Sequence, residues 1–236
     1  MKIEIWSDIM CPFCYIGKRK FEHALEQFEN NNPIIIEWKS FQLMPGLKTD
    51  PVRKSDEFLA EEKGVTIDHA RAMNAHASQM AKDVGLVFDF DKAIPANTFN
   101  AHRLIHMAKA HGKQHEAEEV LFRSYFTDGQ NLDDIETLTS IGEKIGLNAN
   151  DVRAALKSDK FADDVRNDIY EAQQIGVRGV PFFVFDRKYA VSGAQPSDVF
   201  IQVLDKSFSE WRKENPTINL EVTTDGSACA ADGRCD

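Results

Sequence analysis

The chain has 236 residues and a formal net charge of -10 at pH 7. This charge argues against nucleic acid or an anionic membrane as a partner, and no stretch is apolar for long enough to span a bilayer. Residues 1–8 lack the basic and apolar regions of a signal peptide, so the sequence predicts a cytoplasmic protein. Four cysteines are too few for a secreted fold held together by disulfides.

The first expected element is a strand over residues 2–6, where β-branched residues alternate with polar ones. A helical pattern follows, and its apolar stripe consists of Phe21, Ala24, Leu25 and Phe28. Between them lie Cys11 and Cys14, with Pro12 directly after the first cysteine. We expect Pro12 at the first helical position, where a missing N–H costs nothing, and Cys11 at the helix N-terminus. The unpaired N–H groups and the helix dipole there favour a thiolate at Cys11.

A Cys-x-x-Cys pair serves either as a redox switch or as half of a zinc site. Zinc takes four ligands, and the remaining cysteines, Cys229 and Cys235, lie far away and are more widely spaced. Here the cysteine pair follows a strand and begins a helix, with proline after the first cysteine, and this arrangement favours the redox hypothesis. The sequence therefore predicts a dithiol in which Cys11 is the nucleophile and Cys14 the resolving cysteine.

The rest of the chain alternates between short strand patterns and a long block of helical ones. A second strand is expected over residues 34–41, in the centre of the sheet and parallel to the first. Helical patterns follow at residues 55–63, 66–84, 97–111, 114–126, 133–145, 150–157 and 160–175. Strands are expected again at 182–185 and 189–192, and a last helix from residue 196 or 197.

The helical block must bury its apolar stripes, so it is expected to form a domain of its own. We predict a helical domain over residues 51–175, inserted into an α/β domain made of residues 1–50 and 176–215. The composition becomes polar after Pro216, so residues 216–236 are expected to form a flexible tail, which carries Cys229 and Cys235.

Cys11-Pro12-Phe13-Cys14, with Val180-Pro181 far downstream, resembles the thioredoxin superfamily in its DsbA-like branch. The resemblance implies a thioredoxin fold with a large all-helical insertion. It also implies that the Val180–Pro181 bond is cis and that this loop lies against the cysteines. An extended substrate would then bind at Pro12, Phe13, Val180 and Pro181.

Within that branch the chain resembles the FrnE-type dithiol oxidoreductases, through Ser7-Asp8 and residues 97–104, 176–181 and 192–195. This resemblance implies that His102 flanks the cysteine cleft as a substrate-binding residue. It also implies that Cys229 and Cys235 form a second redox pair that exchanges with the first, although five residues separate them here and four do in such relatives.

The alternative function is a glutathione-dependent isomerase or transferase, because the related 2-hydroxychromene-2-carboxylate isomerases and kappa-type glutathione transferases share this architecture. Those relatives carry serine at the first cysteine position. Because this chain has cysteine there, the dithiol mechanism is the preferred prediction. No cofactor is expected, apart from glutathione as a co-substrate. The expected partners are disulfides of proteins or small molecules, and the sequence leaves monomer and homodimer open.

Two further features refine these expectations. DsbA has histidine where this chain has Phe13, so the Cys11 thiolate lacks an imidazole partner and the couple should be less oxidising. Disulfide reduction or isomerisation is then favoured over oxidation. His102 and His106 are four residues apart on one predicted helix, but Arg103 stands where a metal-binding His-Glu-x-x-His motif has glutamate. No metal is expected.

Overall fold

The computed structural model describes residues 1–29 and 33–216. Its strands are β1 (Lys2–Ser7), β2 (Ile35–Ser40), β3 (Phe182–Phe185) and β4 (Tyr189–Ser192). Its helices are α1 (Pro12–Gln27), α2 (Ser55–Lys63), α3 (Ile67–Lys82), α4 (Phe99–Lys109), α5 (Gln114–Phe126), α6 (Ile135–Lys144), α7 (Ala149–Lys157), α8 (Ala162–Gln174) and α9 (Ser197–Glu214). The expected elements are thus present, with bounds that differ by at most a few residues.

The four strands form one sheet in the order β2-β1-β3-β4. Strand β2 is parallel to β1, as predicted, whereas β3 is antiparallel to both β1 and β4. The expectation that the second strand is central is wrong, because β1 pairs on its other side with β3 and leaves β2 at the edge. Ile35 is 67% exposed, and Glu37 and Lys39 place charges along this strand, which is typical of a sheet edge.

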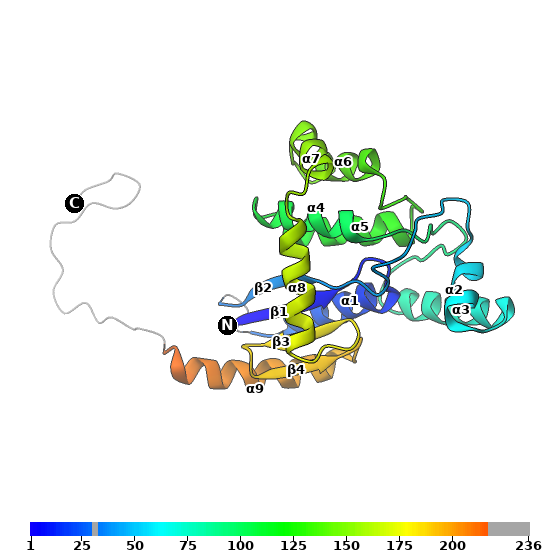
Figure 1. Ribbon diagram of the computed structural model, residues 1–236. Coiled ribbons are helices and arrows are strands. Elements are labelled where there is room, and N and C mark those ends of the chain that lie inside the picture. The colour runs from blue at the N-terminus through cyan, green and yellow to red at the C-terminus, as the bar shows by residue number, and fades with distance from the viewer. Residues whose placement is uncertain (30–32, 217–236) are drawn as a thin grey trace, which may run out of the picture.

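Helices cover both faces of the sheet (Figure 1). One face carries Ile3, Ile5, Phe183 and Phe185, which pack with residues of α1 and α9 such as Phe21 and Phe200. The other face carries Trp6 and Val184, which pack with Ala172 of α8 and Val177. This division follows from the alternation of side chains along β1 and β3.

A second core lies among helices α4 to α7, which stack above the sheet in Figure 1. Ile9, Cys11, Cys14, Tyr15 and Ile16 also belong to this core, although they come from the loop after β1 and the start of α1. The first turns of α1 are therefore buried against the helical region, whereas the later turns pack against the sheet. The two cysteines lie where these two cores meet.

The order of elements, β1-α1-β2, then helices, then β3-β4-α9, confirms the expected thioredoxin fold interrupted by helices. The domain boundaries remain a prediction. Helix α8, which the predicted helical domain includes, packs against β2 and covers one face of the sheet. Within the described ranges, no helix is both long and apolar enough to cross a membrane.

Candidate active site

The two cysteines lie at the beginning of α1. Cys11 is the N-cap, with extended backbone angles (φ -87, ψ 112), and Pro12 is the first helical residue, as the sequence predicts. The first turn contains no acidic residue that would offset the positive end of the helix dipole at Cys11. Cys11 is 5% exposed and Cys14 1% exposed, and both carry free thiols.

The loop before β3 lies directly against Cys11. The Val180–Pro181 peptide bond is cis, and the Cys11 thiol donates to the carbonyl oxygen of Val180 at 3.6 Å. On the other side of the loop, the Gly193 N–H donates to the Pro181 carbonyl at 2.8 Å. The structure thus brings together Cys11, Val180 and Pro181, which are about 170 positions apart in the chain.

Cys14 has a different environment from Cys11. Burial raises the pKa of the Cys14 thiol, and the neighbouring Cys11 acts in the same direction. The backbone N–H of Asp8 and the hydroxyl of Ser7 face this thiol and partly offset that effect. Cys14 is therefore a neutral thiol at neutral pH, a suitable state for a residue that reacts second.

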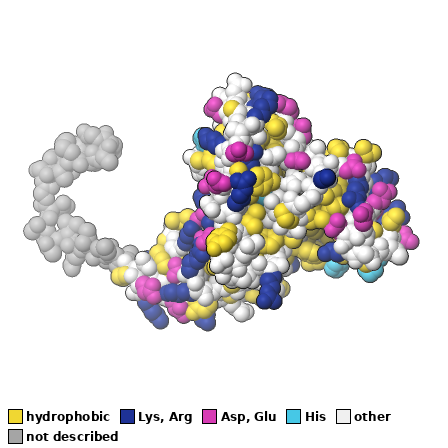
Figure 2. Space-filling view, in the orientation of Figure 1, with side chains coloured by type: hydrophobic (Ala, Val, Ile, Leu, Met, Phe, Trp, Pro, Cys, Tyr) yellow, Lys and Arg dark blue, Asp and Glu magenta, His cyan; other side chains and the backbone are white. Residues whose placement is uncertain are grey.

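Apolar side chains are exposed on the segments that carry or adjoin this thiol pair. Phe13 stands between the cysteines and is 40% exposed, Leu43 is 44% exposed, and Val180 is half-buried. The backbone N–H of Leu43 donates to Asp8 Oδ2 at 2.7 Å, which fixes the loop after β2 beside the loop after β1. On the face seen in Figure 2, hydrophobic side chains gather over the middle, and acidic and basic side chains are interspersed around them.

His102 is buried beside Asp8 rather than exposed at the surface. It is 1% exposed, and its Nε2 is 3.4 Å from Oδ1 of Asp8, which is fully buried. The expectation that His102 binds substrate does not fit this position, because the ring has no accessible surface to offer. The sequence pattern located the helix of His102 near the cysteines, but it did not indicate the depth of the side chain.

Two residues of α5, Glu118 and Tyr125, face the same buried region and were not anticipated. Burial raises the pKa of Glu118 to about 8; the Lys18 charge opposes this shift, and Asp8 and Glu119 add to it. Burial also raises the pKa of Tyr125, with a contribution from Asp8. Because Glu118 sits among glutamates in an amphipathic helix, its sequence pattern was indistinguishable from that of a solvent-facing residue.

The other residues of the Asn97–Leu104 stretch have structural roles. Asn97 Nδ2 donates to the carbonyls of Pro45 and Leu47, and its Oδ1 accepts from the N–H of Phe99. Arg103 is 5% exposed. It donates to the carbonyl oxygens of Ala155, Leu156, Ser158 and Lys160, which lie at the C-terminal end of α7 and just beyond it.

His106 forms a cluster with Ser40 and Asp168 that superficially suggests a hydrolytic triad. Its Nε2 lies 3.1 Å from Ser40 Oγ and 3.0 Å from Asp168 Oδ2. A triad needs the serine and the carboxylate on different ring nitrogens, whereas both contact the same nitrogen here, and all three residues are buried. Among the described residues, no group of three His, Cys, Asp or Glu side chains is arranged to hold a metal ion.

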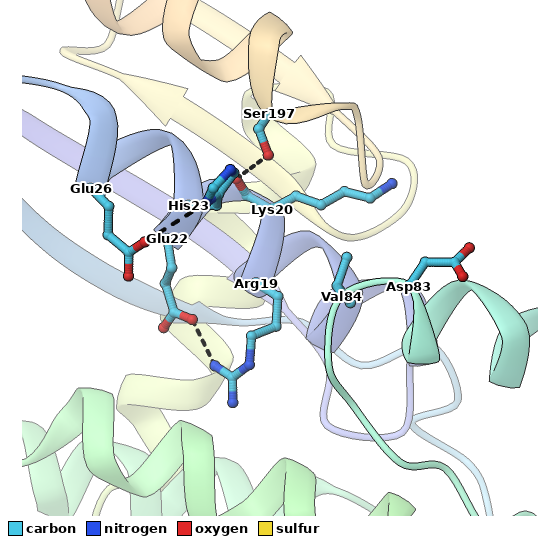
Figure 3. Close-up of a pocket in the computed structure, with 8 residues that line it drawn as sticks. All are labelled: Arg19, Lys20, Glu22, His23, Glu26, Asp83, Val84 and Ser197. Atoms are coloured by element: carbon cyan, nitrogen blue, oxygen red, sulfur yellow. Dashed lines mark hydrogen bonds and ion pairs between the residues drawn. The ribbon is translucent and has the colours of Figure 1, made fainter.

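A cavity of about 350 Å³ lies beside α1, between the end of α3 and the start of α9. None of the predicted site residues lines it. Its charges compensate one another, since Arg19 pairs with Glu22 and His23 with Glu26, as Figure 3 shows. The thiol pair, rather than this cavity, is the chemically distinctive site.

The predicted second pair, Cys229 and Cys235, lies outside the described residues.

The chain matches the model of the DSBA-like thioredoxin domain over residues 2–205. It is 37% identical to a probable DsbA oxidoreductase from Streptomyces coelicolor, with a TM-score of 0.84 over 100% of this chain and 98% of that one. It is also 28% identical to the uncharacterized protein YwbO of Bacillus subtilis, over 90% of this chain and 98% of that protein.

A more distant structure shares the fold alone: the cytosolic disulfide reductase DsbM of Pseudomonas aeruginosa, 15% identical, with a TM-score of 0.61 over 89% of this chain and 100% of that one. The family match spans both the cysteine pair and the Pro181 loop. This chain belongs to the family of DSBA-like thioredoxin domains.

Proposed function

We propose that the protein is a thiol–disulfide oxidoreductase in which Cys11 attacks a substrate disulfide and Cys14 resolves the mixed disulfide. The observation that carries this proposal is the position of Cys11, which combines the N-terminus of α1 with a contact to Val180 at the edge of the Pro181 loop. A thiolate at a helix N-terminus is stabilised by the first-turn N–H groups and by the dipole.

The surroundings of Cys14, of the Pro181 loop and of Phe13 support the roles assigned to the two cysteines. Cys14 lies one turn inside the helix with a raised pKa, which leaves the first attack to Cys11. The backbone carbonyl of Val180 lies against the thiol and suits an extended segment of substrate. Phe13 offers apolar surface between the cysteines, and Leu43 offers more on the loop that contacts Asp8, which suits the hydrophobic residues near a disulfide in an unfolded or partly folded protein.

The direction proposed is reduction or isomerisation of disulfides rather than their formation. Phe13 contributes no charge that would stabilise the reduced state. Glutathione as a co-substrate, exchange with Cys229 and Cys235, and a cytoplasmic location belong to the same proposal. The mixed charges around the apolar patch in Figure 2 and the net charge of -10 suit protein disulfides better than nucleic acid.

Reduction of insulin with glutathione as electron donor tests the proposal. Cys11→Ser should abolish turnover, and Cys14→Ser should also abolish it while trapping a mixed disulfide on Cys11. A Cys14→Ser variant that conjugates glutathione to an electrophile as well as the unsubstituted chain would instead support the glutathione-dependent transferase or isomerase.

The double variant Cys229→Ser/Cys235→Ser separates the role of the tail from that of the first pair. If the tail exchanges disulfides with Cys11, this variant should retain the fast reaction of Cys11 and lose turnover. Mass spectrometry of the Cys14→Ser chain should then detect a disulfide between Cys11 and Cys229 or Cys235. Full turnover in the double variant would exclude the tail from the cycle.

A further inference from the structure

A second cavity, of about 400 Å³, lies between α8 and the loop after β2. Helix α8 packs against β2 and stands in front of the sheet in Figure 1. We call this cavity the α8 groove. Its lining includes Gln42, Pro45, Phe99, Arg166, Tyr170 and Gln173.

Both walls of the α8 groove continue into segments that contact the thiol site. On the wall formed by the loop after β2, the Leu43 N–H donates to Asp8 Oδ2 at 2.7 Å, and the Asp8 carbonyl accepts from the N–H of Cys11 at 3.0 Å. On the other wall, the loop after α8 leads to Val180, whose carbonyl oxygen lies 3.6 Å from the Cys11 thiol. A polypeptide that reacts at Cys11 can therefore continue into the groove.

The α8 groove is positively charged in an acidic protein. The chain has a net charge of -10, yet among the described residues no carboxylate lines this groove. The Arg166 side chain is 60% exposed, and its Nη1 donates to Asp163 Oδ1 at 2.8 Å. Asp163 is 89% exposed, and such a surface ion pair contributes little, so an incoming carboxylate can replace it. Arg178, on the loop toward Val180, is exposed and adds a second cation.

The other side chains of the groove suit a polypeptide. The guanidinium of Arg166 lies over the ring of Phe99, 5.6 Å from its centroid, and this contact orients the cation. Tyr170 is 62% exposed and offers aromatic surface. Gln42 Nε2 donates to Asn97 Oδ1 at 3.1 Å, which leaves the Gln42 carbonyl oxygen to accept from a backbone N–H of an extended chain.

We propose that the α8 groove binds an acidic, extended segment of the polypeptide whose disulfide Cys11 attacks, and that Arg166 binds a carboxylate of that segment. This proposal rests on the proposed oxidoreductase function and names its substrate class. The planar guanidinium matches a carboxylate with two parallel hydrogen bonds. The net charge of the protein repels acidic chains, so a preference for them has to arise locally, in the groove.

The test uses the reduced full-length chain with Cys229 and Cys235 changed to serine. Two peptides each carry a single cysteine in a disulfide with 5-thio-2-nitrobenzoate, and they differ only in having glutamates or glutamines on both sides of it. The Cys11 thiolate attacks the peptide sulfur, the coloured thiolate leaves, and Cys14 then displaces the peptide. Each rate is divided by the rate of the same peptide with 2-mercaptoethanol, which removes differences in intrinsic reactivity.

The acidic peptide should react about threefold to tenfold faster than the amide peptide at low salt. This advantage should decline between about 0.01 M and about 1 M salt. Arg166→Gln should remove it, and Arg166→Lys, which keeps the charge, should retain part of it. Tyr170→Ala should slow the reaction of both peptides.

The matched control is Arg212→Gln. The Arg212 guanidinium also lies over a phenylalanine ring, 5.0 Å from the centroid of Phe208, but on α9, which packs on the other face of the sheet. This variant loses the same charge as Arg166→Gln and should keep the advantage of the acidic peptide. Thermal unfolding checks that each variant is folded, and Arg166→Met provides a second uncharged variant.

The outcomes distinguish the two proposals. Release from both peptides at no more than the rate with 2-mercaptoethanol would overturn the oxidoreductase function. Fast release with equal rates for the two peptides, or an advantage that survives Arg166→Gln, would overturn the groove proposal alone. Dependence on Arg178 and not on Arg166 would also overturn it, because the carboxylate would then bind at the loop.

The tail of the chain is the other candidate occupant, since it carries four acidic residues, Glu221, Asp225, Asp232 and Asp236. Changing these four residues to their amides should leave the advantage of the acidic peptide unchanged. An advantage that appears only after this change would show that the tail, and not the substrate, occupies the groove.

Discussion

Gly17 of α1 lies directly against the ring of Pro181. A Cβ at Gly17 would stand 3.0 Å from Pro181 Cγ and 3.4 Å from the Cβ of Ala194. Carbon atoms pack best at about 3.5–4.0 Å, so a methyl group here would force the loop away from the helix. A glycine inside a helix costs about 0.5–1 kcal/mol relative to alanine, and the close approach of the Pro181 loop explains why it stands here.

The substitution Gly17→Ala should therefore lower activity without unfolding the protein. The methyl group displaces Pro181 relative to Cys11 by a few tenths of an ångström, since the ring is the nearest neighbour. A displacement of about 1 Å at a reacting group can cost 10²-fold, so we expect a loss of roughly threefold to tenfold in kcat/KM for insulin reduction. Alanine favours the helix more than glycine does, whereas crowding against Pro181 destabilises the variant. Because these two effects oppose each other, the thermal midpoint of unfolding should change little.

A double-mutant cycle checks the cause of that loss. In a Pro181→Ala background the Cγ atom is absent, so Gly17→Ala should have a much smaller additional effect. Gly46→Ala is the control, because a Cβ at Gly46 meets nothing within 4 Å. Equal effects of Gly17→Ala with and without the proline ring would contradict the contact as the cause.

Phe13 should set the reduction potential of the cysteine pair. It is exposed between the cysteines and provides no charge to a thiolate at Cys11. Phe13→His adds an imidazole that stabilises the thiolate when protonated, which favours the reduced form and makes the couple more oxidising. Equilibration with glutathione buffers at pH 7 should shift by about tenfold toward reduction, or about 30 mV. Phe13→Leu is the uncharged control and should leave the equilibrium nearly unchanged.

Local patterns in the sequence were sufficient to predict the elements of this fold but not their order in the sheet. The bounds of α5, β3 and β4 agree with the predicted ranges, because apolar periodicity and turn residues act over a few positions. The edge position of β2 depends on β3 pairing with β1, and these strands are nearly 180 residues apart. A local pattern carries no information about a pairing at that distance.

The candidate site, like the fold, was predictable only where short sequence motifs determine it. The short motif around Cys11 and the Val180–Pro181 pair predicted which segments meet, and the structure places them in contact. Gly17 was not identified, because its role depends on a ring that approaches from a distant loop. The predicted helix at residues 133–145 illustrates the limit as well: Asp134 caps α6, and Asp133 accepts a hydrogen bond from Thr49 instead.

Arg103 should be important for stability rather than for catalysis. It is 5% exposed and donates to the carbonyl oxygens of Leu156 and Lys160, at the end of α7 and just beyond it, where the last carbonyls of a helix lack an intrahelical partner. Arg103→Ala should lower the free energy of unfolding by about 3 kcal/mol in urea, because it leaves buried carbonyls unpaired. The rate of insulin reduction should be unchanged at temperatures where the variant is folded.

Arg153 provides the comparison for this prediction. It lies on α7, and its partner Glu136 is well exposed. Arg153→Ala should lower the free energy of unfolding far less than Arg103→Ala does, since exposed ion pairs contribute little. Similar losses in the two variants would show that the carbonyl contacts of Arg103 add nothing beyond those of a surface arginine.

Glu118 should make the stability of the protein depend on pH in a direction opposite to that of most carboxylates. Burial raises its pKa to about 8 in the folded state, compared with 4.5 for an ordinary glutamate. The folded protein therefore binds this proton more tightly than the unfolded chain does. The resulting stabilisation is fully present below pH 4.5 and is lost as the pH rises through about 8.

Glu118→Gln removes that proton equilibrium while keeping the shape of the side chain. Relative to the parent, its free energy of unfolding should rise by roughly 1.4 kcal/mol for each pH unit between pH 5 and 8, then level off. Glu119→Gln is the neighbouring control. Burial raises the pKa of Glu119, but hydrogen bonds from Arg19 and Lys18 outweigh this and lower it. Its stabilisation is lost only as the pH falls, so the difference between this variant and the parent should stay nearly constant from pH 5 to about 7, below the titration of Glu118. Urea unfolding from pH 5 to 9 measures both, and a Glu118→Gln difference that does not change with pH would show that this carboxyl ionises as an ordinary glutamate.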